Sequence, residues 1–253
     1  HLPARRRELR GRRGMIGEVV FVTLPGFAVG AAVMALANRR APAETARARW
    51  LKLGVFFLIV HVVLGVAAAG QPWLAVLLAV LLAAGTAELW RAWKRIATPR
   101  PRRVWTLFVI LGAAAFAVAW RLPPAAFAFL FVVTATCDGF SQVVGQWLGR
   151  RPLAPRISPG KTVGGFLGGL SAAAVVGVLT RDLLPAGPVA AAALAVLASI
   201  AGLAGDLAAS WVKRRAGIKD YSSALPGQGG FLDRFDSLLG ALAVAGGVLL
   251  AYT

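Results

Sequence analysis

Eight apolar stretches, each about long enough to cross a lipid bilayer, dominate this sequence of 253 residues. A helix needs about 20 apolar residues to cross the hydrocarbon core, and a backbone surrounded by lipid must satisfy its hydrogen bonds within the bundle. The sequence therefore predicts an all-α fold, a polytopic transmembrane helical bundle of about eight spans without a separate soluble domain. The expected spans are 15–37, 51–69, 73–90, 104–120, 124–145, 163–180, 187–212 and 232–252.

Basic residues alternate between the two sides of these spans. Four joints are rich in Lys and Arg, near 38–50, 91–103, 146–161 and 213–230. Three others hold almost none, at 70–72, 121–123 and 181–186. Because short cytoplasmic loops carry the excess of Lys and Arg, we expect the basic joints in the cytosol, the C-terminus outside, and a location in the bacterial cytoplasmic (inner) membrane.

The formal net charge of +18 follows from these joints. Attraction to anionic headgroups adds to it, so membrane lipids are expected partners. Nucleic acid is not expected, because the basic residues lie between spans rather than on one binding face. The only Cys is Cys137, which excludes an internal disulfide.

The first apolar stretch does not fit the alternation. Residues 1–14 carry six Arg, yet strict alternation places them outside. Three interpretations stay open: a plain span with a basic outer tail, a re-entrant or interfacial segment bent near Pro25, or a signal peptide ending at residues 35–37. We therefore divide the chain into a basic N-terminal segment with one span or re-entrant helix, residues 1–50, and a transmembrane domain, residues 51–253.

A polar stripe marks the cytosolic end of the seventh expected span. Asp206, Ser210, Lys213 and Arg214 follow one another at helical spacing, so they share one face. Charged groups in a span are costly and mark candidate functional sites. We therefore expect this stripe to lead into a site at the cytosolic joint.

Asp233 and Asp236 share a face at the start of the last span, because they are three residues apart. Arg234 lies between them, and the preceding loop holds Lys219-Asp220 and a Pro-Gly-Gln-Gly-Gly run at 226–230. Carboxylates from two helices suit Mg²⁺, which often takes one or two of them and lets substrate phosphates complete its shell. The alternative interpretation is that these residues form salt bridges that join two helices.

A second polar segment, Ser158-Pro-Gly-Lys-Thr162, precedes the sixth expected span. It is not a Walker loop, because that motif needs a Gly where Pro155 stands and a preceding strand, which we do not expect here. Its hydroxyls, its Lys and the free amides of a helix N-terminus still suit an anion. The glycines that follow have small-xxx-small spacing, which predicts close helix packing: Gly164, Gly165, Gly168 and Gly169.

Asp138 lies in an otherwise apolar stretch of the fifth expected span. A carboxylate at this depth is a candidate functional residue. It could reach the same metal or ligand as the other carboxylates, or it could pair with a Lys. Both interpretations stay open.

The run SWVKRRAGIKDYSSALPGQGGFLDRFD at 210–236 resembles the signature of the phosphatidate cytidylyltransferases, also called CDP-diglyceride synthases. Gly205-Asp206-Leu207 fits the same pattern. Asp138 with Gly145, followed by the segment 157–162, resembles the other shared segment of that family. The resemblance covers roughly residues 50–253, and the added block at 15–37 is similar to a CDP-diglyceride synthase-like branch with an extra N-terminal segment.

This resemblance implies an enzyme that transfers a cytidylyl group from CTP to phosphatidate, giving CDP-diacylglycerol and pyrophosphate. The alternatives are the same chemistry on another lipid phosphate, or a weakly active homologue that acts as a membrane scaffold. A homodimer is one assembly that this interpretation allows, and the sequence does not determine the oligomeric state. One or two Mg²⁺ ions are implied, to which a monovalent cation could be added, with three metal ligands: Asp206, Asp233 and Asp236.

The resemblance also implies roles for the other polar residues. The residues implied to act on the phosphates or to support those that do are Asp138, Lys213, Arg214, Lys219, Asp220 and Arg234. The residues implied to bind substrate are Ser158, Lys161, Thr162, Ser210, Gln228, Gly229 and Gly230.

Three positions depart from the family pattern. Family members commonly have His at Gln228, Glu at Gly164, and a small or amide residue at Cys137. Gln can hydrogen-bond a phosphate or a base but cannot carry a proton at neutral pH.

Overall fold

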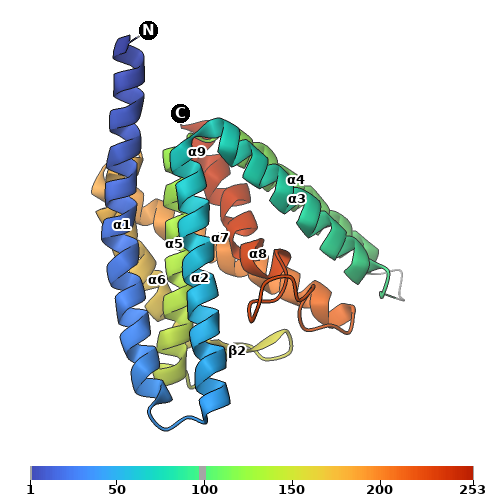
Figure 1. The fold of residues 1–253 in the computed structure, drawn as a ribbon. Helices are drawn as coiled ribbons and strands as arrows, with labels where there is room; N and C mark the ends of the chain where they lie inside the picture. The colour runs from blue at the N-terminus through green and yellow to red at the C-terminus, as the bar shows by residue number, and fades with distance from the viewer. Residues whose placement is uncertain (1, 97–100, 253) are drawn as a thin grey trace.

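The computed structural model describes residues 2–96 and 101–252, and over these the chain is a bundle of helices with one small hairpin (Figure 1). The helices before the hairpin are α1 (Leu2–Asn38), α2 (Ala43–Ala69), α3 (Gln71–Trp93), α4 (Pro101–Arg121) and α5 (Pro124–Leu148). The hairpin consists of β1 (Pro152–Ala154) and β2 (Ser158–Thr162). After it come α6 (Val163–Leu179), the 3₁₀ turn η1 (Arg181–Leu183), α7 (Pro188–Arg215), α8 (Leu232–Ala241), the π-helical turn η2 (Leu242–Gly246) and α9 (Gly247–Ala251).

The transmembrane helical prediction is confirmed. Within the described residues, six helices are long and apolar enough to cross a membrane: Gly14–Asn38, Ala43–Ala69, Gln71–Trp93, Pro124–Leu148, Pro188–Arg215 and Leu232–Ala251. Two shorter apolar helices, Val109–Arg121 and Val163–Leu179, lie where the other two of the eight spans were expected. The last span is continuous because η2 joins α8 to α9.

Helix α1 runs through Pro25 without a break. A proline inside a helix removes one backbone hydrogen bond and kinks or breaks the helix, yet α1 stays helical and packs along α2 (Figure 1). The unbroken helix favours a plain span over a re-entrant segment bent at this residue. The side chains of the basic tail, up to residue 13, lie outside the described part of the structure.

Helix α5 forms the centre of the bundle. It packs against α2, α6, α7 and α8, and its side chains from Ala126 to Thr134 are all buried. Phe127 and Phe129 among them are fully buried. Large apolar side chains on outer faces, such as Phe21 and Val189, are exposed, as expected of helices that face lipid.

Close contact between α5 and α6 depends on glycine. A Cβ added to Gly165 would lie 2.6 Å from the carbonyl oxygen of Ser141, and one added to Gly169 would collide with Ser141 and the carbonyl of Cys137. Small residues let two membrane helices approach to backbone contact. The close packing predicted for this glycine run is therefore confirmed.

The hairpin between α5 and α6 was not predicted. Strand β2 pairs antiparallel with β1, matching Ser158 with Ala154 and Thr162 with Pro152, so the expectation that no strand precedes the Lys161 segment is wrong. The conclusion drawn from it stands: β2 contains the Gly-Lys-Thr residues and runs straight into α6, without the phosphate-binding loop that a Walker motif places between strand and helix.

The loops that carry the predicted site lie toward one end of the bundle. Figure 1 shows the α1–α2 connection and the hairpin at the end away from the two chain termini, with the loop between α7 and α8 beside the start of α8. This agrees with the alternation of basic joints. Helices α3 and α4 lean away from α1 and α2, and α3 contacts α8.

Candidate functional site

The hairpin and the polar stripe of α7 meet at Lys161 and Asp206. The Lys161 ammonium forms an ion pair with Asp206, and the Ser210 hydroxyl donates a hydrogen bond to Asp206 Oδ1 at 3.2 Å. Burial disfavours the ammonium ion, but Asp206 and Asp138 outweigh it and raise the pKa of Lys161 above its ordinary value. The structure thus joins two segments that the sequence proposed separately.

A second ion pair joins α7 to α8. Lys213 Nζ lies 2.6 Å from Asp233 Oδ1, and both side chains are buried. The other oxygen, Asp233 Oδ2, accepts hydrogen bonds from the backbone N–H of Tyr221 and of Gly230, each at 2.8 Å. The alternative interpretation, a salt bridge that joins two helices, therefore describes this pair.

Three carboxylates from three helices, Asp138 of α5, Asp206 of α7 and Asp236 of α8, lie in the same region as these pairs. Asp236 is only 4% exposed and accepts a hydrogen bond from the Ser237 N–H at 2.8 Å. It lies near enough to Asp206 and Asp138 to interact electrostatically with both. Like charges that interact raise one another's energy, so a cation or substrate donors near this cluster of carboxylates would be favourable.

Arg234 is the donor next to this cluster. It interacts electrostatically with Asp138, and its Nε is buried with no hydrogen-bond partner in the described part of the chain. A buried donor without a hydrogen-bond partner destabilises the structure by the full free energy of its desolvation. A phosphate oxygen is the type of group that a guanidinium binds best.

The carboxylate oxygens of the three predicted metal ligands are only partly available to bind Mg²⁺. Among the described residues, no three His, Cys, Asp or Glu side chains are grouped so that they could hold a metal ion by themselves. Asp233 has both oxygens engaged, by an ammonium and by two amides. Asp206 is engaged as well, by the Lys161 ammonium and the Ser210 hydroxyl, so it could bind a metal only if Lys161 turned away. Asp236 forms no ion pair within the described residues, and two carboxylates are enough for Mg²⁺ where substrate phosphates supply the other oxygens.

Several predicted residues hold the site's loops in place. Arg214 Nε donates to the carbonyl of Ile157 at 3.1 Å and so ties α7 to the hairpin. Gln228 Nε2 donates to the carbonyl of Lys52 at 2.6 Å and ties the 216–231 loop to α2. Thr162 caps α6 by accepting a hydrogen bond from the Gly165 N–H.

The remaining predicted residues are less engaged. Lys219 and Asp220 are exposed and Ser158 is half-buried, and within the described chain none of the three forms a side-chain hydrogen bond or an ion pair. Gly229 has φ of +84°, a conformation that favours glycine. A side chain there would also come within 2.8 Å of Asp233 Oδ2.

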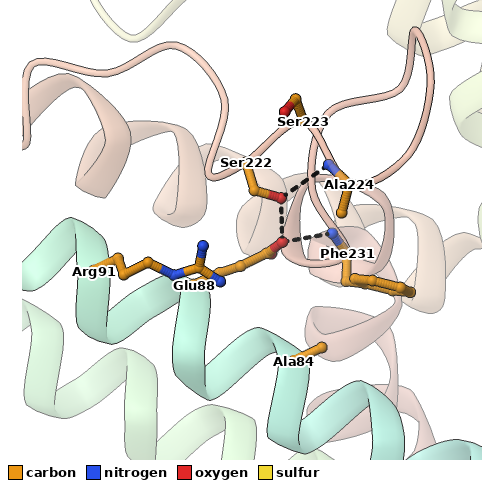
Figure 2. A pocket seen from close by; sticks show the side chains of 7 residues that line it. All are labelled: Ala84, Glu88, Arg91, Ser222, Ser223, Ala224 and Phe231. Atoms are coloured by element: carbon orange, nitrogen blue, oxygen red, sulfur yellow. Dashed lines mark hydrogen bonds between the residues drawn. The ribbon is translucent and has the colours of Figure 1, made fainter.

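The sequence interpretation missed Glu88, which lies on α3 and is only 2% exposed. Figure 2 shows its carboxylate between the Ser222 hydroxyl and the Phe231 N–H, at the side of a cavity of about 320 Å³. Arg91, Ser223 and Ala224 complete much of the cavity wall.

Tyr221 was also missed. Its hydroxyl donates to the carbonyl of Ala209 at 3.0 Å, and its ring lies beside the Lys213 ammonium. Burial, together with Asp236 and Asp233, raises the pKa of its phenol. Tyr221 therefore anchors the loop to α7 as a neutral hydrogen-bond donor.

Residues 15–251 match the model of the cytidylyltransferase family. This chain belongs to the cytidylyltransferase family. The match includes the apolar part of α1, so the first span lies within the region that defines this cytidylyltransferase family.

Three curated relatives match this chain over less than half of their own length. The phosphatidate cytidylyltransferase of Brucella abortus biovar 1 is 47% identical over 117 residues, which are 46% of this chain and 43% of that protein. Proteins of the same name from Aquifex aeolicus and Bacillus subtilis are 43% and 42% identical over 102 and 110 residues. Those segments are 40% and 43% of this chain, and 38% and 41% of the two relatives.

Proposed function

We propose that this cytidylyltransferase makes CDP-diacylglycerol from CTP and phosphatidate. A phosphate oxygen of phosphatidate attacks the α-phosphorus of CTP, the bond from that phosphorus to the bridging oxygen breaks, and pyrophosphate leaves. The names of the relatives suggest the two substrates. The observation that carries the proposal is the buried Arg234 donor beside the Asp138, Asp206 and Asp236 carboxylates, at the end of a membrane bundle.

The two substrates are both polyanions, so their approach needs positive charge. Transfer of this kind is catalysed mainly by positioning and by neutralising charge. Arg234 can donate to a phosphate oxygen without losing another partner. Lys161 is paired with Asp206 and 27% exposed at its side chain, so it can turn toward an arriving phosphate while staying near the carboxylates.

Asp206 and Asp236 would hold a divalent ion. A bound Mg²⁺ would offset the charge of the attacking and leaving oxygens. Lys213 and Asp233 would keep α7 and α8 in register, because their ion pair spans the two helices. The buried carboxylates would otherwise repel the phosphates, which is why the cations and the metal must act together.

The site would face the cytosol, where CTP is present. The basic joints carry most of the positive charge, and two of them include the hairpin and the loop after α7. Under the rule that cytoplasmic loops hold the excess of Lys and Arg, these joints are cytosolic. The protein would then lie in the bacterial inner membrane, and phosphatidate would enter sideways from the bilayer.

A lipid-transfer assay tests the function. Purified protein in detergent–phosphatidate micelles receives CTP labelled in the α-phosphate and Mg²⁺, and the lipid product is separated and its mass measured. We expect a labelled product with the mass of CDP-diacylglycerol. A panel of other lipid phosphates tests the substrate, and absence of lipid-linked CMP with every lipid would refute the proposal.

Matched variants link activity to the site. Arg234→Gln should lose most activity, since Gln keeps a hydrogen-bonding group but no charge. Asp182→Asn removes an exposed charge from the connection between α6 and α7 and should behave as wild type, because Asp182 lies on no element of the site. Equal activity of the two variants would contradict the placement of the site.

A further inference from the structure

Glu88 is a buried carboxylate on the membrane helix α3. It is 2% exposed, and no ion pair involves it among the described residues. Its oxygens instead accept three hydrogen bonds: Oε1 from the Ser222 hydroxyl at 2.6 Å and the Phe231 N–H at 3.1 Å, and Oε2 from the Leu232 N–H at 2.8 Å. Hydrogen bonds to a carboxylate are stronger than those to a neutral acceptor, so these three bonds fix the orientation of the Glu88 side chain.

Two of these donors belong to the uncapped start of α8. The first N–H groups of any helix have no partner within it. The N-cap residue of α8 is Phe231, whose side chain cannot accept a hydrogen bond. Glu88 therefore supplies the cap from another helix, and its negative charge is favourable at a helix N-terminus.

The backbone at this point is shaped to admit the carboxylate. A Cβ at Gly230 would lie 2.5 Å from Glu88 Oε1 and 2.7 Å from Oε2, so any side chain there would push the carboxylate away. The Gly230 N–H meanwhile donates to Asp233 on the opposite side. Two carboxylates thus hold consecutive amides of the loop, one from α3 and one from α8 itself.

We propose that Glu88 is a positioning residue that fixes the first turn of α8 and thereby sets Arg234 and Asp236 in the site. This inference rests on the proposed transferase function, and it adds α3 to the elements that build the site. Glu88 does not touch the reacting groups. It acts through α8, whose first two turns carry both residues.

The test uses Glu88→Gln in the full-length protein. Gln keeps the size but turns one acceptor oxygen into an N–H₂ donor, so one of the loop donors loses its acceptor. A misplacement of about 1 Å can cost on the order of 100-fold in rate. We expect kcat for CMP transfer to fall roughly 10- to 100-fold, with little change in KM for CTP. Glu44→Gln, at an exposed Glu on α2, is the matched control and should behave as wild type.

Amide hydrogen exchange gives a readout that does not depend on activity. In Glu88→Gln we expect faster exchange in peptides covering 222–232 and unchanged exchange in peptides from α5 and α6. Ser222→Ala, which removes a single donor, should raise exchange in the same peptides to a smaller degree. These local changes separate positioning from a general loss of stability.

The outcomes are distinguishable. Wild-type kcat in Glu88→Gln would overturn the inference, and so would a loss of activity with unchanged exchange at 222–232 or with equally faster exchange along the whole chain. Wild-type protein that transfers no CMP to any lipid phosphate would overturn the proposed function instead. In that case the exchange data would still decide whether Glu88 holds the start of α8.

Discussion

Removing the ammonium of Lys213 should destabilise the bundle strongly. Lys213 is 8% exposed and Asp233 is 7% exposed, and their charged atoms are 2.6 Å apart. Breaking a buried pair by removing one partner costs about 3–5 kcal/mol, because an uncompensated charge is left behind. For a chain of this size, each kcal/mol lowers Tm by roughly 2–4 °C. Lys213→Met should therefore lower Tm by about 6–20 °C.

The only Cys in the sequence provides the assay. Cys137 is 4% exposed in the core, so a thiol-reactive dye that fluoresces on coupling reports its exposure as the protein unfolds in detergent. Arg181→Met is the control, because Arg181 and Asp182 are 3.6 Å apart with side chains 46% and 69% exposed. A surface pair of this kind contributes at most about 1 kcal/mol. If Lys213→Met shifted Tm no more than Arg181→Met, the reasoning about the buried pair would be refuted.

Three further predictions concern packing, pH and chemistry. Gly169→Ala should lower Tm by the same dye assay, because its Cβ collides with α5, whereas Gly54→Ala should leave Tm unchanged or raise it, because nothing lies within 4 Å of that Cβ. The raised pKa of Lys161 means that its stabilising contribution is complete below pH 10.5 and is lost as pH rises through the raised value. The Tm difference between wild type and Lys161→Met should accordingly stay constant near neutral pH and shrink above pH 10.5. Asp236→Asn should reduce CMP transfer at least about 100-fold in the labelled-CTP assay, and residual activity near wild type would contradict its role.

The spans and the polar stripe were predictable because both depend on local spacing. A run of about 20 apolar residues has few alternatives to a membrane helix. Asp206 and Ser210 share a face in any helix, and the structure bonds one to the other. The glycine run of α6 likewise predicted close packing without saying which helix would be its partner.

The hairpin was not predictable from propensity. Its strands are three and five residues long, and β2 contains Pro159 and Gly160, which are depleted in strands. Contacts from elsewhere hold it in place: Arg214 binds the carbonyl of Ile157, and Lys161 pairs with Asp206. Tertiary contacts of this kind leave no periodic pattern in the sequence.

The sequence also could not predict which residue each carboxylate would contact. Helical spacing places Asp233 and Asp236 on one face, but it does not fix how α8 is rotated against α7. A rotation that brings Asp233 to Lys213 engages it in an ion pair and leaves Asp236 beside Asp206. The salt-bridge interpretation therefore describes Asp233, and the metal role of Asp236 stays a prediction.

Glu88 is a buried residue that the sequence analysis missed, and one feature of the sequence could have pointed to it. It lies 134 to 144 residues from its partners in the sequence, and a Glu near a span end could simply reach water, so spacing gives no reason to single it out. The start of α8 does give one, because Phe231 precedes it where a Ser, Thr, Asp or Asn would normally cap a helix. Backbone N–H groups buried at that point must find an acceptor. In a membrane bundle with ten acidic residues, an uncapped buried helix start therefore predicts a carboxylate donated by another span, and Glu88 supplies it.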